Sequence, residues 1–175
     1  LGVVVDVSHL NAAGFADVVR IGAAPIVASH SGCHALCAST RNLTDEQLRQ
    51  IGASGWIAGI VFCPAFLRAD GADDADTPLS TLVAHVRHAV EVAGIDHVGI
   101  GADFGSLTQH PTGLDDVSRY PYLTAELIRR GYTDAEVKKV LGLNILRVMR
   151  EVEQAAVRIQ RTRGPSTATI GESRQ

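Results

Sequence analysis

The sequence predicts an α/β protein made of parallel β/α units. Four short apolar runs recur along the chain, and a segment with helical spacing of apolar residues follows each of them. The run at residues 56–62 is apolar throughout, as is typical of a strand buried on both faces of a parallel sheet. A closed parallel barrel has eight such units. Because the chain has four and begins directly with a strand, we expect about half of a (β/α)8 barrel, as a cut chain would show.

Most predicted elements are bounded by residues that begin or end them. Thr44 is a helix N-cap and forms a capping box with Gln47, while Thr133 caps the last helix. Gly94 and Gly131 are typical helix ends. The predicted strands span residues 2–8, 25–30, 56–62 and 97–101. The predicted helices span 12–22, 45–52, 79–93, 121–130 and 134–153, separated by an acidic, solvated loop at 68–78 and a long loop at 104–120.

Composition narrows the class of protein. The chain has 175 residues, 46% hydrophobic and 20% charged, and this composition fits one soluble domain. A net charge of −3 with scattered basic residues disfavours nucleic-acid binding. No apolar stretch approaches the roughly 20 residues that span a bilayer. Cys33, Cys37 and Cys63 match no common zinc motif, so we expect reduced core thiols and a reducing compartment.

The domain is expected to cover residues 1–153. From Gln154 the apolar pattern fades into Arg, Ser, Thr and Gly, which predicts a polar, flexible tail over residues 154–175.

Two histidines end neighbouring predicted strands. His9 and His30 each follow a serine, and Asp103 ends the fourth strand in the same way. Parallel strands bring their carboxyl ends to one edge of a sheet, so these side chains are expected to converge. Imidazoles bind zinc, and a nearby carboxylate either binds the metal or takes a proton from metal-bound water. The pattern predicts metal-assisted hydrolysis, although a single histidine after a buried strand is more often a packed core residue.

Other polar residues favour structural roles. His85 and His88 lie on a predicted helix, away from the strand ends, and Asn144 in a Gly-x-Asn turn is expected to tie backbone groups together. Arg41 just before a helix is equally consistent with bonds to loop carbonyls or with solvent exposure.

Several motifs together resemble the membrane dipeptidase (renal dipeptidase) family of zinc peptidases. They are collinear and extend from Val3 to about Glu153. They read Val-Asp-Val-Ser-His at 5–9, Pro-Ile-Val-Ala-Ser-His-Ser at 25–31, Thr-Arg-Asn-Leu at 40–43, Ala-Gly-Ile-Asp-His-Val-Gly-Ile-Gly-Ala-Asp-Phe at 93–104 and Gly-Leu-Asn-Ile-Leu-Arg-Val at 142–148.

The resemblance implies a fold, a reaction and site residues. The chain would cover strands five to eight of a (β/α)8 barrel of the metal-dependent hydrolase type. His9 and His30 would bind one zinc of a two-zinc centre, and Asp103 would handle the proton of the attacking water. Arg41 would pair with the carboxylate of a dipeptide substrate.

The chain departs from the family pattern in two ways. The family usually has a second acid after the eighth strand, whereas this chain reads Asp103-Phe104-Gly105-Ser106. The His-x-Asp pair, the bridging glutamate and a further histidine of the family have no counterpart here, so this chain alone is not expected to bind two metals fully. Either residues upstream are lost, or the fragment is inactive, or another copy completes the barrel.

The favoured hypothesis is a zinc dipeptidase acting on L,L or L,D dipeptides, with side activity on β-lactams. The alternative is a non-catalytic half-barrel that acts as a binding or oligomerising module through exposed sheet edges. A different amidohydrolase, such as a phosphoesterase or deaminase, is disfavoured by Arg41. We expect a cytoplasmic location, although some relatives are membrane-anchored or secreted, and leave association into a homodimer open.

Overall fold

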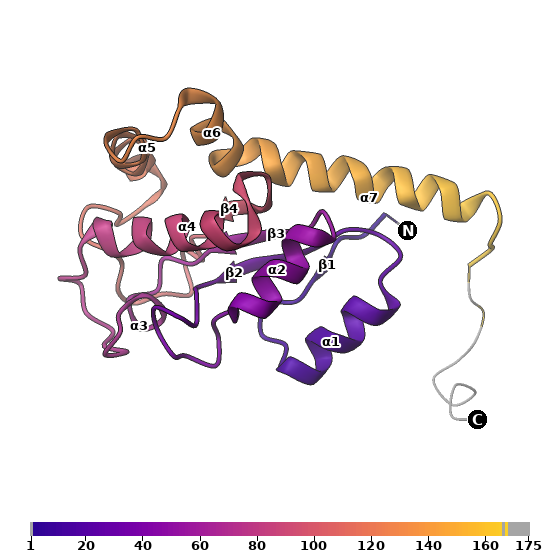
Figure 1. The fold of residues 1–175 in the computed structure, drawn as a ribbon, viewed down its shortest axis with the longest axis horizontal. Helices are drawn as coiled ribbons and strands as arrows, with labels where there is room; N and C mark the ends of the chain where they lie inside the picture. Colours follow the sequence, from indigo (N-terminus) through magenta and orange to yellow (C-terminus); the bar gives the residue numbers. More distant parts are fainter. Residues whose placement is uncertain (1, 166, 168–175) are drawn as a thin grey trace.

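A four-stranded parallel sheet forms the centre of the computed structural model, which describes residues 2–165 and 167. The strands are β1 (Val5–Asp6), β2 (Ile26–Ser31), β3 (Ile57–Ile60) and β4 (Val98–Ile100), and they lie side by side in chain order. Figure 1 shows the sheet between the helices. All four predicted strands are therefore confirmed, and every neighbouring pair is parallel.

Three of the four strands are shorter than predicted, β1 above all. The sequence predicted a strand over 2–8, but only Val5 and Asp6 pair, with Ile26 and Val27. β1 is an edge strand with one partner, so its flanking residues gain few ladder hydrogen bonds.

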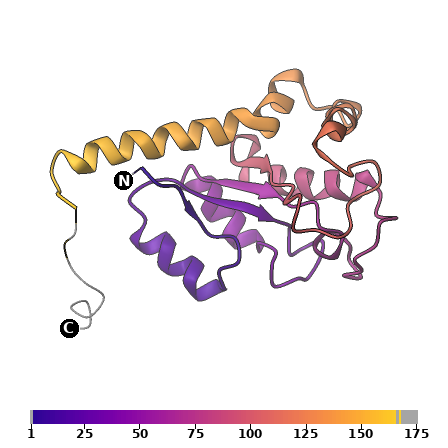
Figure 2. The ribbon, with the colours of Figure 1, turned by 180° about the vertical axis from the view of Figure 1, so that it is seen from behind.

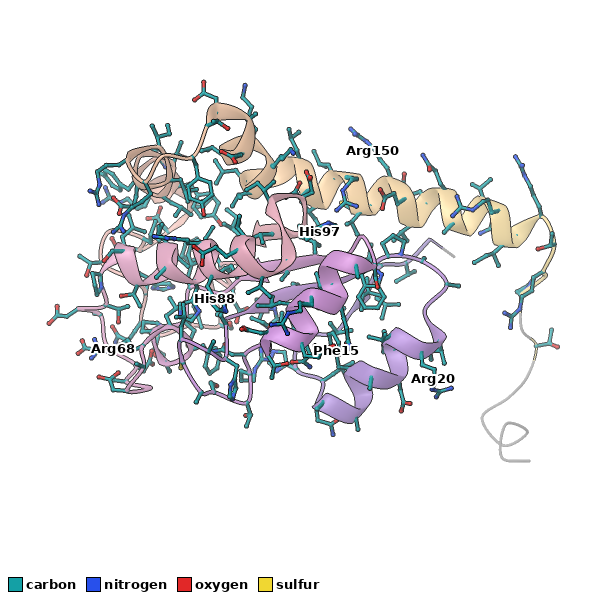
Figure 3. The ribbon with its side chains drawn as sticks, in the orientation of Figure 1. Phe15, Arg20, Arg68, His88, His97 and Arg150 are labelled. Atoms are coloured by element: carbon teal, nitrogen blue, oxygen red, sulfur yellow. The ribbon has the colours of Figure 1, made fainter. Side chains whose placement is uncertain are left out.

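Helices follow the strands as the β/α pattern requires. α1 (Ala12–Ile21) follows β1, α2 (Asp45–Ala53) follows β2, and the short α3 (Pro64–Leu67) and long α4 (Leu79–Ala93) follow β3. The capping box of Thr44 and Gln47 is present, as is a second one between Thr133 and Glu136. Figure 3 shows Phe15 on the inner side of α1, where it is buried, and Arg20 at its exposed end.

The last predicted helix is interrupted. After η1 (Ile95–His97), β4 and η2 (Val117–Arg119) come α5 (Tyr120–Arg129) and α6 (Asp134–Lys138), then a π-helical turn, η3 (Lys139–Leu143), and α7 (Asn144–Gln160). The single helix predicted over 134–153 is wrong, because the backbone of Gly142 leaves the helical conformation.

The last helix also ends later than predicted. α7 continues to Gln160, since Val152 and Ala155 are buried and extend its apolar face past residue 153. Residues 166 and 168–175 of the predicted tail lie outside the described residues.

Two apolar clusters cover opposite faces of the sheet. Ile26, Ala28, Ala58 and Ile60 belong to the main core with α2 and α4. Val27 and Ile57, the alternate residues, pack against α7 through its Val148 and Val152. Figure 2 shows α7 running lengthwise above the strands. In a closed barrel the helices form an outer ring, whereas here helices contact both faces. Within the described part of the chain, no helix is long and apolar enough to cross a membrane.

Asn144 joins α7 to the start of β4. Its buried side-chain amide donates to the carbonyl oxygens of Ile95 and Val98, both at 2.8 Å. The structural role predicted for this residue is confirmed. The two bonds hold α7 in place just after the break at Gly142.

We expect Asn144→Ala to lower the free energy of unfolding by roughly 2–3 kcal/mol, because it leaves two carbonyl oxygens without their donor. Urea unfolding measures the loss. Gln154→Ala, an exposed position on the same helix, should change the value by less than about 0.5 kcal/mol. Equal effects of the two substitutions would contradict this role for Asn144.

His85 is a buried structural residue of α4. The Cys33 amide donates to its Nδ1 at 2.9 Å, and its Nε2–H donates to the Leu67 carbonyl, also at 2.9 Å. Burial lowers the pKa of His85, although the bond to Leu67 acts in the opposite direction. His88, also on α4, contacts Asp45 of α2 at 2.7 Å (Figure 3).

The three cysteines are free and buried. Burial, together with the nearby charge of Asp45, raises the pKa of Cys33 to about 12. The prediction of core thiols is confirmed.

The lowered pKa of His85 gives a testable pH dependence. The native state keeps the ring neutral, while the unfolded chain takes up a proton below about pH 6.5. Its contribution to stability is therefore present above that pH and is lost as the pH falls through it. We expect His85→Gln to flatten the pH dependence of urea unfolding between pH 7.5 and 5.5, and Gln154→Ala, which removes no titratable group, to leave it unchanged. A slope in His85→Gln equal to that of the wild-type chain would refute the assignment.

Candidate active site

His9 and His30 meet at the carboxyl ends of β1 and β2. Their Nε2 atoms lie 2.9 Å apart, and their ring centroids lie 5.0 Å apart with the planes tilted by 60°. The rings thus share one small region although they are 21 residues apart in sequence. The predicted convergence of these two imidazoles is what the structure shows.

Asp103 reaches the same region from β4. Its Oδ2 lies 4.0 Å from the Nε2 of His30, and the two side chains are 30% and 18% exposed, so the site is open to solvent. β3 separates β2 from β4 in the sheet. Gly59 and Gly101 allow their backbone to lie close to that of Ser29 in β2, because a Cβ at either position would overlap the Ser29 carbonyl oxygen.

Two of these three residues have an unusual backbone conformation. His9 has φ 72° and Asp103 has φ 60°, and they are the two non-glycine residues with positive φ among those described. His and Asp tolerate this left-handed region better than most residues, yet it still costs on the order of 1 kcal/mol or more. The conformation turns each side chain at the point where its strand has ended.

A hydrogen-bond network behind the histidines joins β1 to β2. The Asp6 carboxylate accepts from the amides of Ser8 and Ser29, both at 3.0 Å, and from the Ser29 hydroxyl at 2.5 Å. Burial raises the pKa of Asp6, but these bonds outweigh burial and the pKa is lowered overall. Asp6 is therefore an ionised acceptor at neutral pH.

The two serines hold His30 in different ways. Ser8 Oγ accepts from the His30 amide at 3.0 Å and contacts the His30 carbonyl oxygen at 3.3 Å, so it holds the backbone. Ser29 Oγ lies 2.7 Å from His30 Nδ1, so it contacts the ring.

Arg41 lines a separate cavity, to which His9 also contributes. The cavity has a volume of about 400 Å³ and lies at the start of α1 and α2, and His30 and Asp103 do not line it. The guanidinium lies over the ring of Phe66, 5.4 Å from its centroid. Within the described chain no carboxylate forms an ion pair with Arg41, which leaves its charge available for an anion.

The loop after Asp103 is held by aromatic packing. Phe104 contacts the rings of Phe62 and Tyr120, with centroids 5.7 and 6.1 Å away, and lies 5.2 Å from the ring of His110. The Ser106 amide and hydroxyl contact the Asp103 carbonyl oxygen. The loop is therefore anchored at Phe104, next to the carboxylate, without a second acid at position 105.

Metal binding can be judged from the donors present. Two imidazole nitrogens that share one tetrahedral ion through metal–nitrogen bonds of about 2.0–2.1 Å lie about 3.3 Å apart. The observed Nε2 pair, at 2.9 Å, is close to this spacing. Among the described residues, no three His, Cys, Asp or Glu side chains are grouped closely enough to hold an ion. His9 and His30 therefore fit two positions of a metal ligand set and leave the others to further donors.

Sequence reasoning missed Asp6, Ser8 and Ser29 as members of the site. The available signal was the serine before each histidine. Which atoms those serines contact depends on the register between β1 and β2, which the sequence alone does not give.

Comparisons with known proteins identify the family of the chain. A model of the membrane dipeptidase family, peptidase family M19, matches residues 1–163. The dipeptidase ataJ of Aspergillus terreus is 47% identical over 161 residues, which cover 91% of this chain and 38% of the relative. The dipeptidase verJ of Clonostachys rogersoniana is 40% identical over 163 residues, covering 93% of this chain and 40% of the relative.

A solved metallopeptidase of Rhodobacter sphaeroides, crystallised with a phosphinate mimic of the dipeptide L-Ala-D-Ala, superposes with a TM-score of 0.81 at 40% identity. The superposition covers 84% of this chain and 42% of that one. The chain thus spans about two fifths of the length of these three relatives. The extent of the family match and these identities lead to one conclusion: the chain belongs to the membrane dipeptidase family, peptidase family M19.

Proposed function

We propose that this chain carries the histidine pair, the proton-transfer acid and the substrate arginine of a zinc-dependent dipeptidase. The observation that carries the proposal is the 2.9 Å approach of His9 and His30, with Asp103 4.0 Å from His30. Membership of a family of dipeptidases supports the reaction. The chain would correspond to strands five to eight of the family barrel.

Each residue has a distinct task. His9 and His30 would hold zinc, which lowers the pKa of a water molecule and polarises the scissile carbonyl. Asp103, partly exposed and beside the pair, would take a proton from the water and give it to the leaving amine. Arg41 would bind the substrate carboxylate through its planar guanidinium, and so limit the substrate to two residues.

The substrate class follows from these groups. A dipeptide has one amide bond a short distance from a free carboxylate. Asp103 and the histidine pair would act on the amide bond, and Arg41 would bind the carboxylate. The L-Ala-D-Ala mimic bound by the Rhodobacter sphaeroides peptidase supports L,D dipeptides as substrates.

The alternative function is a non-catalytic binding or oligomerising module. The observation in its favour is that, in the described part of the chain, no third side chain stands ready to complete the metal site. Metal binding and hydrolysis must therefore be measured separately.

We expect isothermal titration of the chain with Zn²⁺ to reveal one weak site that requires both histidines. His9→Ala or His30→Ala should abolish it, because a single imidazole binds zinc poorly. His34→Ala removes an exposed histidine from the loop after β2 and is the matched control. Binding that survives His9→Ala and His30→Ala would place the metal elsewhere and reject the site.

Hydrolysis of L-Ala-D-Ala with added Zn²⁺ tests the reaction. We expect Asp103→Asn to lower kcat by roughly 10²–10⁴-fold with zinc binding retained, because the amide cannot carry the proton. Arg41→Lys should chiefly raise KM, by about tenfold, because lysine lacks the planar fork. Asp17→Asn and Arg49→Lys are exposed controls. Zinc bound at the histidines without hydrolysis by the unmodified chain would favour the non-catalytic module.

A further inference from the structure

We propose that Asp6 and Ser29 are positioning residues that act through His30: they hold its proton on Nδ1 and so present the Nε2 lone pair to a metal ion. The proposal rests on the proposed function for the metal ion. The hydrogen bonds from which the proposal is argued are present whether or not the chain hydrolyses peptides.

The protons available to Asp6, Ser29 and His30 permit only one assignment of hydrogen-bond donors and acceptors. An ionised Asp6 carboxylate can only accept, so the single hydroxyl proton of Ser29 lies on the 2.5 Å contact with Asp6. Ser29 Oγ must then accept at its 2.7 Å contact with His30, and His30 Nδ1 must carry the hydrogen. If Ser29 instead donated its proton to His30, the oxygens of Ser29 and Asp6 would face each other at 2.5 Å with no proton between them.

The result fixes the chemistry of the opposite ring nitrogen. A neutral imidazole carries one ring proton, so with Nδ1 protonated the Nε2 of His30 is a lone-pair donor. That atom lies 2.9 Å from His9 Nε2. Because His30 Nε2 has no hydrogen in this arrangement, His9 Nε2–H must be the donor of the contact. A metal ion has to displace the proton of His9 alone, because His30 is already in the ligating form.

The chain thus has a carboxylate–serine–histidine relay. Metal-binding histidines generally donate their second ring N–H to a carboxylate or carbonyl, which sets the tautomer and the ring orientation. Here the serine hydroxyl extends the reach of Asp6 from β1 to a ring on β2. The Asp6 carboxylate also accepts the Ser29 amide at 3.0 Å, so the serine is held at both its backbone and its side chain.

Nitrogen-15 NMR of the metal-free chain tests the tautomer directly. We expect the ring of His30 to be Nδ1-protonated in the unmodified chain. His85, whose Nε2–H donates to Leu67, is an internal reference of the opposite tautomer. Ser29→Ala should abolish the Nδ1 preference of His30, and Ser29→Thr, which keeps the hydroxyl, should restore it.

Ser8→Ala is the matched control. Ser8 is the equivalent serine of the other Ser-His pair and holds only the backbone of His30. It should leave the tautomer unchanged. Circular dichroism of each variant verifies that it folds, and Asp6→Asn provides a second way to break the relay should Ser29→Ala fail to fold.

Zn²⁺ titration gives the second readout. We expect Ser29→Ala and Asp6→Asn each to weaken binding by about 10–100-fold. The double variant should be no weaker than the single ones, because both substitutions break the same relay. Arg49→Lys, an exposed substitution on α2, should stay within about twofold of the unmodified chain.

Three results would overturn the proposal: Nε2-protonated His30 in the unmodified chain, an unchanged tautomer in both Ser29→Ala and Asp6→Asn, or an equal effect of Ser8→Ala on the tautomer. The tautomer is read without metal or substrate. Absence of dipeptide hydrolysis alongside Nδ1-protonated His30 would reject the proposed function and leave the relay standing.

Discussion

The site depends on the contact between β1 and β2 at their carboxyl ends. β1 is only two residues long, and ladder hydrogen bonds alone hold so short an edge strand weakly. Asp6, Ser8 and Ser29 add cross-strand bonds at this point, and the same bonds hold the backbone and ring of His30. The interactions that attach the edge strand are therefore also the ones that orient His30.

The left-handed backbone conformation of His9 and Asp103 likewise depends on the packing of the residues around them. Such conformations persist only where the surrounding structure determines them, and here the residues next to them are strongly held. Val7 is buried in the core and its amide bonds to Val27, while Phe104 packs among aromatic rings. Packing on both sides of the site thus compensates for backbone that the chain would otherwise avoid.

The rest of the fold supports this edge of the sheet from behind. The main core with α2 and α4 covers one face, and α7 covers part of the other through Val148 and Val152. Asn144 links α7 to the start of β4, and so to the strand that carries Asp103. Glycines 59 and 101 bring β3 and β4 close to Ser29, which lets an acid from a non-adjacent strand approach His30.

The sequence by itself determined the order and type of the elements, the convergence of His9, His30 and Asp103, and the structural character of His85 and Asn144. These follow from apolar periodicity, from caps such as Thr44, and from the rule that parallel strands end at one edge. Only the tertiary structure decided the break at Gly142, the length of α7, and the relay from Asp6 through Ser29 to His30. The physical reason is that each of these depends on a partner distant in sequence: the carbonyls that Asn144 bonds, the sheet face that α7 buries, and the β1–β2 register that brings Asp6 to Ser29.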